Sequence, residues 1–182
     1  TSINDGGLRV TPPAANAGST SYEYPDPQWK LGVTVMGPQG PDSIRRVLTF
    51  TTPPLDQDLE VTGPIVLELY VSSTATDADF IVKLADQIPQ SPEDQKAGLQ
   101  PASVNVSKGW MRASHRQKDE KRSTKLRPFY THNSPQPIIP GEIYKLDIEV
   151  MPCAYVFKTG HRIRLEITSS DFPNHDRNHN TG

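Results

Sequence analysis

Residues 144–150 read YKLDIEV, and this stretch decides the fold. Every second position from Tyr144 to Val150 is apolar or aromatic, and the positions between them are Lys, Asp and Glu. This period-2 alternation is typical of a strand with one face buried and the other in water. The Pro140-Gly141 turn stands in front of it. The stretch therefore predicts a half-buried β-strand with a defined register.

The same kind of pattern recurs along the chain. It predicts further strands, separated by turn-forming residues, over 46–51, 65–71, 80–84, 110–113 and 163–167. We expect strands 65–71 and 80–84 to pair or to face each other across a core. No segment shows apolar residues at helical spacing for three turns. The sequence therefore predicts an all-β sandwich or barrel.

Two segments lack this alternation of apolar and polar residues. Residues 1–44 are rich in Pro, Gly, Ser and Asn, a composition that resists both helices and central strands, so we expect an extended Pro-rich leader or linker there. We place the sandwich at 45–182. Residues 86–107 contain three prolines and few large apolar side chains, which indicates a long excursion outside the core.

Composition narrows the classes of partner. The 19 Lys and Arg residues nearly balance the 21 Asp and Glu residues, and the net charge is −2. This balance offers no basic field for nucleic acid or for an anionic membrane surface, and no run approaches the ~20 apolar residues of a membrane span. A single cysteine, Cys153, forms no internal disulfide. Because residue 1 is Thr, we expect the gene product to start upstream, so the compartment stays undetermined.

Several blocks of sequence resemble a known family. Over roughly residues 20–182 the chain is similar to the carboxy-terminal domain of the acyl-hydrolase family that includes cocaine esterase and X-Pro dipeptidyl-peptidase. The blocks are LTFTTPPL (48–55), LEVTGP (59–64), DFIVKLAD (79–86), GWMRASHR (109–116), PGEIY (140–144), GHRIRLEI (160–167), SSDFP (169–173) and DRN (176–178).

The resemblance implies a jelly-roll β-sandwich of the galactose-binding-domain-like type. It also implies an α/β-hydrolase domain upstream in the same polypeptide, which carries the Ser, Asp and His triad, and it allows a homo-oligomer. None of that triad maps here. The 86–107 excursion is longer than the family minimum, and the family usually continues past Gly182, so we expect the sandwich to be truncated at its C-terminal end. The implied role is an accessory domain of an ester or Xaa-Pro hydrolase.

The residues themselves give little support for catalysis in this chain. The Gly-x-Ser-x-Gly elbow of an α/β-hydrolase is absent. A new triad would have to combine one of the serines with His161 or His175 and with Asp171 or Asp176. We favour no catalytic residue here.

The densest set of metal-ligand types is Asp171, His175, Asp176 and His179. No HExxH or paired-cysteine motif accompanies it, so we predict no metal and no cofactor. We favour ionic or capping contacts of Asp176 and Arg177 that order the loop after a core strand. A free-standing metal hydrolase built on Asp171, His175 and His179 is the least favoured hypothesis.

A carbohydrate-binding module is the main alternative. Its stacking platform would come from the aromatic residues, and burial of the same residues explains them equally well. They are Tyr22, Tyr24, Trp29, Trp110, Tyr130 and Tyr155.

Three further features have structural interpretations. We interpret the charged segment His115–Arg127 as a solvated loop rather than a nucleic-acid site. We expect His161 and Arg162 to extend from the edge of the sandwich at a strand start. Met111 and Cys153 are expected to fill gaps in the core.

Overall fold

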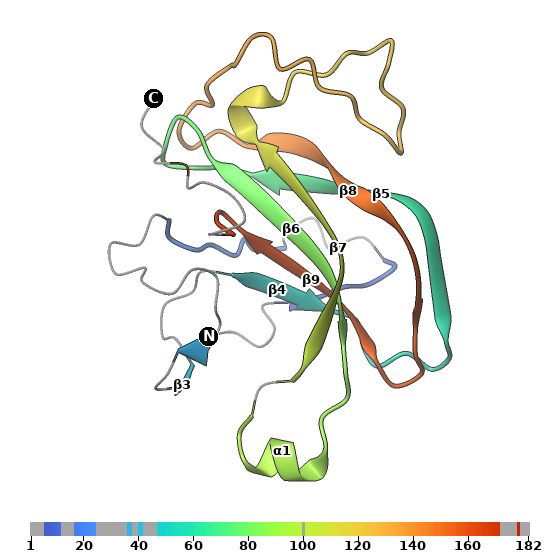
Figure 1. Ribbon diagram of the computed structural model, residues 1–182. Coiled ribbons are helices and arrows are strands. Elements are labelled where there is room, and N and C mark those ends of the chain that lie inside the picture. Colours follow the sequence, from blue (N-terminus) through green and yellow to red (C-terminus); the bar gives the residue numbers. More distant parts are fainter. Residues whose placement is uncertain are drawn as a thin grey trace.

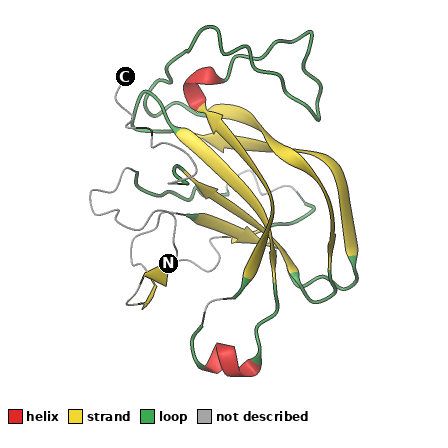
Figure 2. Ribbon diagram, viewed as in Figure 1, coloured by secondary structure: helices red, strands yellow, loops and turns green. Residues whose placement is uncertain are grey.

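The computed structural model describes residues 6–11, 17–24, 36–37, 40–41, 47–99, 101–171 and 178. These residues are mostly strand and loop, which confirms the all-β fold (Figure 2). The helical segments among them are α1 (Pro92–Lys96) and η1 (Ala113–His115), and neither is long or apolar enough to cross a bilayer. The strands are β1 (Gly6–Gly7), β2 (Met36–Gly37), β3 (Gly40–Pro41), β4 (Leu48–Thr51), β5 (Leu59–Val71), β6 (Asp79–Gln87), β7 (Ser103–Arg112), β8 (Tyr144–Phe157) and β9 (Arg162–Thr168).

One mixed sheet carries most of these strands, in the order β1-β4-β9-β6-β7-β8-β5 (Figure 1). Its neighbours are antiparallel except for β1 and β4, which run parallel. The β7–β8 connection consists of the single pair Gly109 and Val150, whereas β5 and β8 pair along most of their length. The sheet therefore curls at this point, and the β5–β8 pair covers one face of the remaining strands.

The hydrophobic core fills the space between these two parts of the sheet. Val82 of β6 and Ile148 of β8 are both fully buried, and Ile167 of β9 lies in the same cluster. Alternation explains the arrangement, because every second residue of each strand points to the same face. The other buried members are Leu48, Ala78, Phe80, Met111, Ala113, Ile138, Leu146 and Val150.

Gly109 permits the crossing of β7 and β8. A Cβ atom at this position would lie 2.2 Å from the Glu149 carbonyl oxygen and 3.0 Å from the Val150 Cα atom. Only a residue without a side chain fits this approach of two backbones. We call the contact of Gly109 with Glu149 and Val150 the strand junction.

The strands are longer than the apolar alternation predicts. The strand expected over 80–84 continues to Gln87, and the one expected over 110–113 begins at Ser103. Polar residues occupy these extensions, and backbone hydrogen bonding between β6 and β7 continues across them. The excursion predicted for 86–107 is therefore too long, because only 88–102 leaves the sheet.

The 88–102 loop also holds the short helix that the sequence analysis did not predict. Ser91 caps α1 by accepting a hydrogen bond from the Asp94 backbone N–H at 3.0 Å. Pro92 stands in the first turn, where its missing N–H costs no helical hydrogen bond. One turn is too short to produce the apolar periodicity on which helix prediction relies.

The strands expected over 65–71 and 80–84 face each other and do not pair. β5 bonds to β8, whereas β6 bonds to β7 and β9. Within the leader predicted for 1–44, Gly6 and Gly7 pair with Phe50 and Thr51, and Tyr22 packs against the core.

Candidate functional site

Three polar side chains, one buried and two half-buried, meet at the end of the sheet near α1. The Asp86 carboxylate of β6 is 2% exposed. His161 Nδ1 lies 2.9 Å from Asp86 Oδ1 and 3.0 Å from Oδ2, and the Tyr155 hydroxyl donates to Oδ2 at 2.9 Å. A buried carboxylate is costly without such partners. We call Asp86, Tyr155 and His161 the polar end, because they tie together β6, β8 and the start of β9.

Tyr155 serves the polar end as a hydrogen-bond donor. Its bond to Asp86 raises the pKa of the phenol, because a phenolate would face the carboxylate, and desolvation raises the pKa further. Its ring packs edge-on against Phe157, with centroids 5.0 Å apart. The phenol therefore stays neutral at physiological pH and holds the carboxylate in place.

His161 and Asp86 have the geometry of two members of a catalytic triad, but the third is missing from the contacts described. Within the described part of the chain, the His161 side chain is bonded to Asp86 alone. Two buried serines have other partners: Ser107 donates to the Met151 carbonyl at 2.6 Å, and Ser114 donates to Asp77 at 2.9 Å. Among the described residues, the imidazole is thus oriented by Asp86 and contacts no serine.

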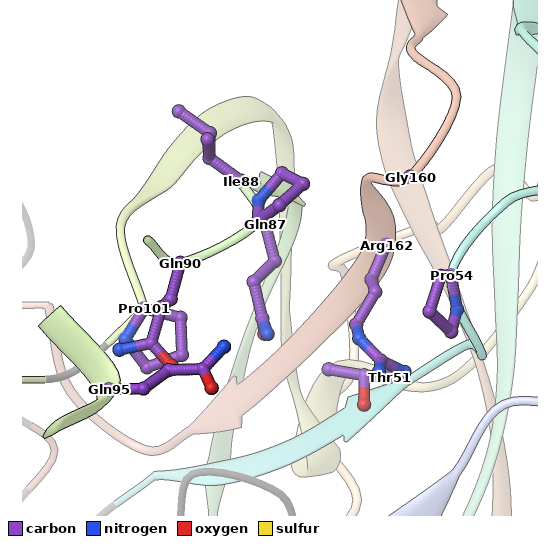
Figure 3. Close-up of a pocket in the computed structure, with 10 residues that line it drawn as sticks. Thr51, Pro54, Gln87, Ile88, Gln90, Gln95, Pro101, Gly160 and Arg162 are labelled. Atoms are coloured by element: carbon purple, nitrogen blue, oxygen red, sulfur yellow. The ribbon is translucent and has the colours of Figure 1, made fainter. Parts of the chain in front are cut away.

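A cavity of about 400 Å³ opens beside the polar end (Figure 3). Arg162 lies on it and follows His161 directly, so the two side chains point to opposite sides of the strand start. Gly160, with a φ of +81°, makes the turn that leads into β9. The lining residues are Thr51, Pro54, Gln87, Ile88, Pro89, Gln90, Gln95, Pro101, Gly160 and Arg162.

The cavity offers hydrogen bonds rather than reactive groups. Arg162 Nη1 donates to the Thr52 carbonyl at 2.8 Å, which fixes its guanidinium beside the opening. The Gln87 amide oxygen accepts a bond of 3.3 Å from Arg164, and Gln90 Nε2 donates to the Leu99 carbonyl at 2.6 Å. Amides and a guanidinium bind polar ligands, and they supply neither a nucleophile nor a base.

Asp171 forms an ion pair with Lys83, a residue that was not considered for a catalytic triad or a metal site. Its carboxylate is 2.6 Å from Lys83 Nζ of β6, and its side chain is 7% exposed. No group of three His, Cys, Asp or Glu residues that could hold a metal occurs among the described residues. His175, Asp176, Arg177 and His179 lie outside them, so those predictions stay untested.

The candidate aromatic residues do not gather into one platform among the residues described. Tyr22 contacts Ser169 at 2.5 Å, Tyr130 donates to the Asp147 carbonyl, and Tyr155 belongs to the polar end. Trp110 is 47% exposed on β7. Trp29 lies outside the described residues.

The charged segment 115–127 is an irregular loop with mostly exposed basic residues. Lys118 is its anchor, because its Nζ lies 2.6 Å from the Asp147 carboxylate of β8. Burial alone would raise the pKa of Asp147, but Lys118 and Lys145 together lower it. Arg122 lies over the Phe129 ring at 3.4 Å. These contacts hold the loop against the sheet.

The remaining predictions concern individual side chains. Met111 is buried in the core, as expected, and Cys153 is half-buried with Sγ 3.8 Å from the Val61 carbonyl oxygen. His161 does not extend to solvent as expected, because its ring turns inward to Asp86. The buried carboxylate supplies a hydrogen-bonding partner that the sequence pattern does not show.

Asp86 and Gln87 are the residues of this site that the sequence analysis missed. Both were assigned to the excursion, whereas they end strand β6. A signal was present: Asp86 continues the inward series of Phe80, Val82 and Leu84 at spacing two. A charged residue in an inward position indicates a buried polar contact.

Comparison with known proteins gives a consistent result. Residues 3–182 match the family model of the X-Pro dipeptidyl-peptidase C-terminal non-catalytic domain. The chain is 34% identical over 170 residues to the cocaine esterase of Rhodococcus sp. (strain MB1 Bresler), which covers 88% of this chain and 26% of that protein. The chain thus spans about a quarter of the length of the curated relatives it matches.

Solved structures show the same likeness. An aminopeptidase from a marine sediment Thaumarchaeota archaeon is 30% identical with a TM-score of 0.60, over 77% of this chain and 21% of that one. An alpha-amino acid ester hydrolase is 28% identical with a TM-score of 0.58, over 75% of this chain and 20% of that one.

Proposed function

The chain belongs to the family of X-Pro dipeptidyl-peptidase C-terminal non-catalytic domains, and we propose that it is the accessory domain of a serine hydrolase that cleaves acyl esters or Xaa-Pro peptides. The family match over residues 3–182 carries this proposal. The domain packs on an α/β-hydrolase domain of the same polypeptide and helps to form the wall of its substrate pocket.

The proposal divides the chain into two parts. Residues 1–44 lead from the hydrolase domain, and residues 45–182 form a jelly-roll sandwich of the galactose-binding-like type. The curled sheet with its core between two parts supports this assignment. The hydrolase domain performs the two-step acyl transfer, in which a serine attacks the carbonyl, a histidine moves the proton and backbone donors hold the oxyanion.

The loop between η1 and β8 is the surface that we assign to the hydrolase domain. It is fixed from beneath, because Ile138 is buried and its N–H donates to the Thr76 carbonyl at 2.8 Å. Arg116 stacks over Tyr144 at 4.7 Å and bonds to the Gln136 carbonyl. Ile139 and Ile143 are 57% and 74% exposed on this fixed loop. A loop that is held in one conformation and exposes apolar side chains is suited to a permanent contact with another domain.

Labelling tests whether this chain carries chemistry. A fluorophosphonate reacts with activated serines, and intact-mass analysis of the treated chain should show no added mass. A stoichiometric adduct would place an activated serine in the chain and overturn the accessory role.

Deletion tests the accessory role in the full-length polypeptide. Removal of residues 45–182 should lower kcat/KM or the thermal stability of the hydrolase, and the Ile143→Asp variant should show a weaker form of the same defect. Ile88→Asp is the matched control, because Ile88 is 37% exposed on the opposite loop. Full activity and stability after the deletion would reject the proposal.

Carbohydrate binding is the second candidate, and the amide-lined cavity favours it. Glutamine and arginine side chains bind sugar hydroxyls in such sites. A glycan array should give hits that Gln87→Ala and Arg162→Ala abolish together, and an array without hits would remove this candidate.

A further inference from the structure

Gln87 presents a hydrogen-bond donor to the cavity beside α1. Its side chain is largely buried, with 9% exposed, and its amide oxygen accepts from Arg164 Nη1 at 3.3 Å. Because a guanidinium only donates hydrogen bonds, the oxygen must face Arg164, and the Nε2 group is left for the cavity that Gln87 lines. Within the described part of the chain, Nε2 has no hydrogen-bonding partner. A buried donor of this kind favours a ligand that accepts from it.

Arg162 lies directly opposite Gln87 on the neighbouring strand. The antiparallel register of β6 and β9 pairs these two residues, so their side chains stand on the same face of the sheet, with Cβ atoms about 5 Å apart. Figure 3 shows both side chains on the wall of the cavity. The bond from Nη1 to the Thr52 carbonyl at 2.8 Å fixes the guanidinium and leaves its other N–H groups for a ligand. The two donors are thus held in place before a ligand binds.

The charge of Arg162 is not balanced within the cavity. The nearby arginine, Arg164, pairs with the Glu166 carboxylate at 2.7 Å. Asp86 faces the opposite side of β6 from Gln87, where it has its own partners. Among the residues described, no carboxylate pairs with Arg162, and no acidic residue lines the cavity. A half-buried cation beside a free amide donor favours an anionic ligand.

We propose that the cavity binds the carboxylate group of a small organic acid. One carboxylate oxygen accepts from the Arg162 guanidinium and the other from Gln87 Nε2. The body of the acid lies against the rigid apolar rings of Pro54, Pro89 and Pro101, which also line the cavity. A volume of about 400 Å³ is near the lower end of small-molecule sites, so the ligand is about as large as a dipeptide or a monosaccharide.

The charge distinguishes this ligand from the neutral sugar of the second candidate function. A hydroxyl group accepts a hydrogen bond from Arg162 but leaves the positive charge unbalanced, whereas a carboxylate does both. The far wall of the cavity supplies an acceptor, because Gln90 Nε2 donates to the Leu99 carbonyl and its amide oxygen remains for a ligand. An acid that also carries a hydroxyl or an ammonium group therefore gains a second contact.

The site does not depend on the accessory role. The cavity lies beside α1, whereas the loop that we assign to the hydrolase domain lies between η1 and β8, at the other end of the sheet (Figure 1). A free acid, the C-terminus of a short peptide and a sugar acid all carry the carboxylate that the cavity recognises. The experiment separates these three sources.

NMR titration of the 182-residue chain tests the site. Cyclopentanecarboxylate should shift the signals of the Gln87 side-chain amide and the Arg162 Nε–H until they saturate. Cyclopentanecarboxamide has the same shape without the charge, and it should bind about tenfold more weakly or worse. Alanyl-proline and glucuronate carry the same carboxylate on a peptide and on a sugar, so the acid that binds most tightly identifies the source.

Substitutions assign the binding to the two donors. Arg162→Gln should weaken carboxylate binding by about tenfold or more, because it removes the charge. Gln87→Glu should have an effect of similar size, because it places a like charge beside the ligand while it still accepts from Arg164. Arg116→Gln is the matched control, since Arg116 is also held by backbone carbonyls but lies at the other end of the sheet. Circular dichroism verifies that each variant is folded.

Three results would overturn the proposal. The first is that none of the three acids gives saturable shifts at the cavity. The second is that a neutral ligand binds as tightly as its acid, either the carboxamide or glucose in place of glucuronate, which would favour a neutral sugar instead. The third is that folded Arg162→Gln and Gln87→Glu bind the acids as tightly as Arg116→Gln does.

Discussion

The strand junction and the polar end hold the same two layers together by opposite means. At the junction, Gly109 brings the backbones of β7 and β8 into contact among apolar side chains. At the polar end, Asp86 is buried with two hydrogen-bonding partners from distant parts of the chain. The junction depends on the absence of a side chain, whereas the polar end depends on a buried carboxylate that would be costly without its two partners.

The comparison predicts that the junction is the less tolerant of the two. Gly109→Ala should lower the free energy of unfolding by about 4 kcal/mol or more, because the new Cβ would meet backbone atoms that have no rotamer to change. Urea unfolding followed by circular dichroism measures this loss. Gly18→Ala is the matched control, since a Cβ there has no neighbour within 4 Å. Equal stability of the two variants would show that the layers can separate freely at the junction.

At the polar end the largest expected effect follows removal of the carboxylate. Asp86→Ala should cost about 3 kcal/mol, because it removes the buried acceptor that His161 and Tyr155 share. The same urea experiment measures it. Asp86→Asn keeps an acceptor for the Tyr155 hydroxyl, so we expect it to cost less. If Asp86→Ala proved neutral, water must reach the polar end readily.

A smaller change removes one hydrogen bond and keeps the packing. Tyr155→Phe should cost about 1 kcal/mol, since the ring still packs on Phe157 and only the bond to Asp86 is lost. Thermal unfolding of this variant beside the unmodified chain gives the value. A cost as large as that of Asp86→Ala would mean that the phenol, and not the imidazole, supports the buried charge.

The smallest expected effect concerns Asp58, whose exposed carboxylate lies at the same end of the sheet as the polar end. Lys158 and the Thr159 N–H bond to Asp58 and lower its pKa from 3.8 to about 2. A lowered pKa in the folded state adds stability above pH 4, and this stability is lost as the pH falls towards 2. NMR titration should give a midpoint near 2 for Asp58, and Asp58→Asn should flatten stability between these pH values. A midpoint near 4 would show that Lys158 and Thr159 leave the carboxylate free.

Local alternation was sufficient to locate the strands of the core. The patterns around Leu146 and Leu165 predicted strands that the structure contains as β8 and β9. Their ends were not predictable in the same way, because Gln87 and Ser103 extend β6 and β7 through backbone bonds that do not depend on side-chain polarity. The single turn of α1 was missed because it is shorter than the pattern that identifies helices.

The polar end was harder to predict than the strands that carry it. Asp86, Tyr155 and His161 are separated by up to 75 positions in the sequence. The inward position of Asp86 indicates a buried polar contact, but nothing local identifies Tyr155 and His161 as its partners. Their contact requires the register of β6 against β9, which places Asp86 opposite Ile163.

By itself, the sequence determined the all-β class and most core strands, because alternation expresses the two faces of a strand within a few residues. Its blocks of similar sequence also determined the family. The tertiary structure alone decided that Gly109 lies against Glu149, that Asp86 accepts from His161 and Tyr155, and that Gln87 lies opposite Arg162. Those contacts join residues far apart in the chain, so they depend on how the sheet curls, which no local pattern specifies.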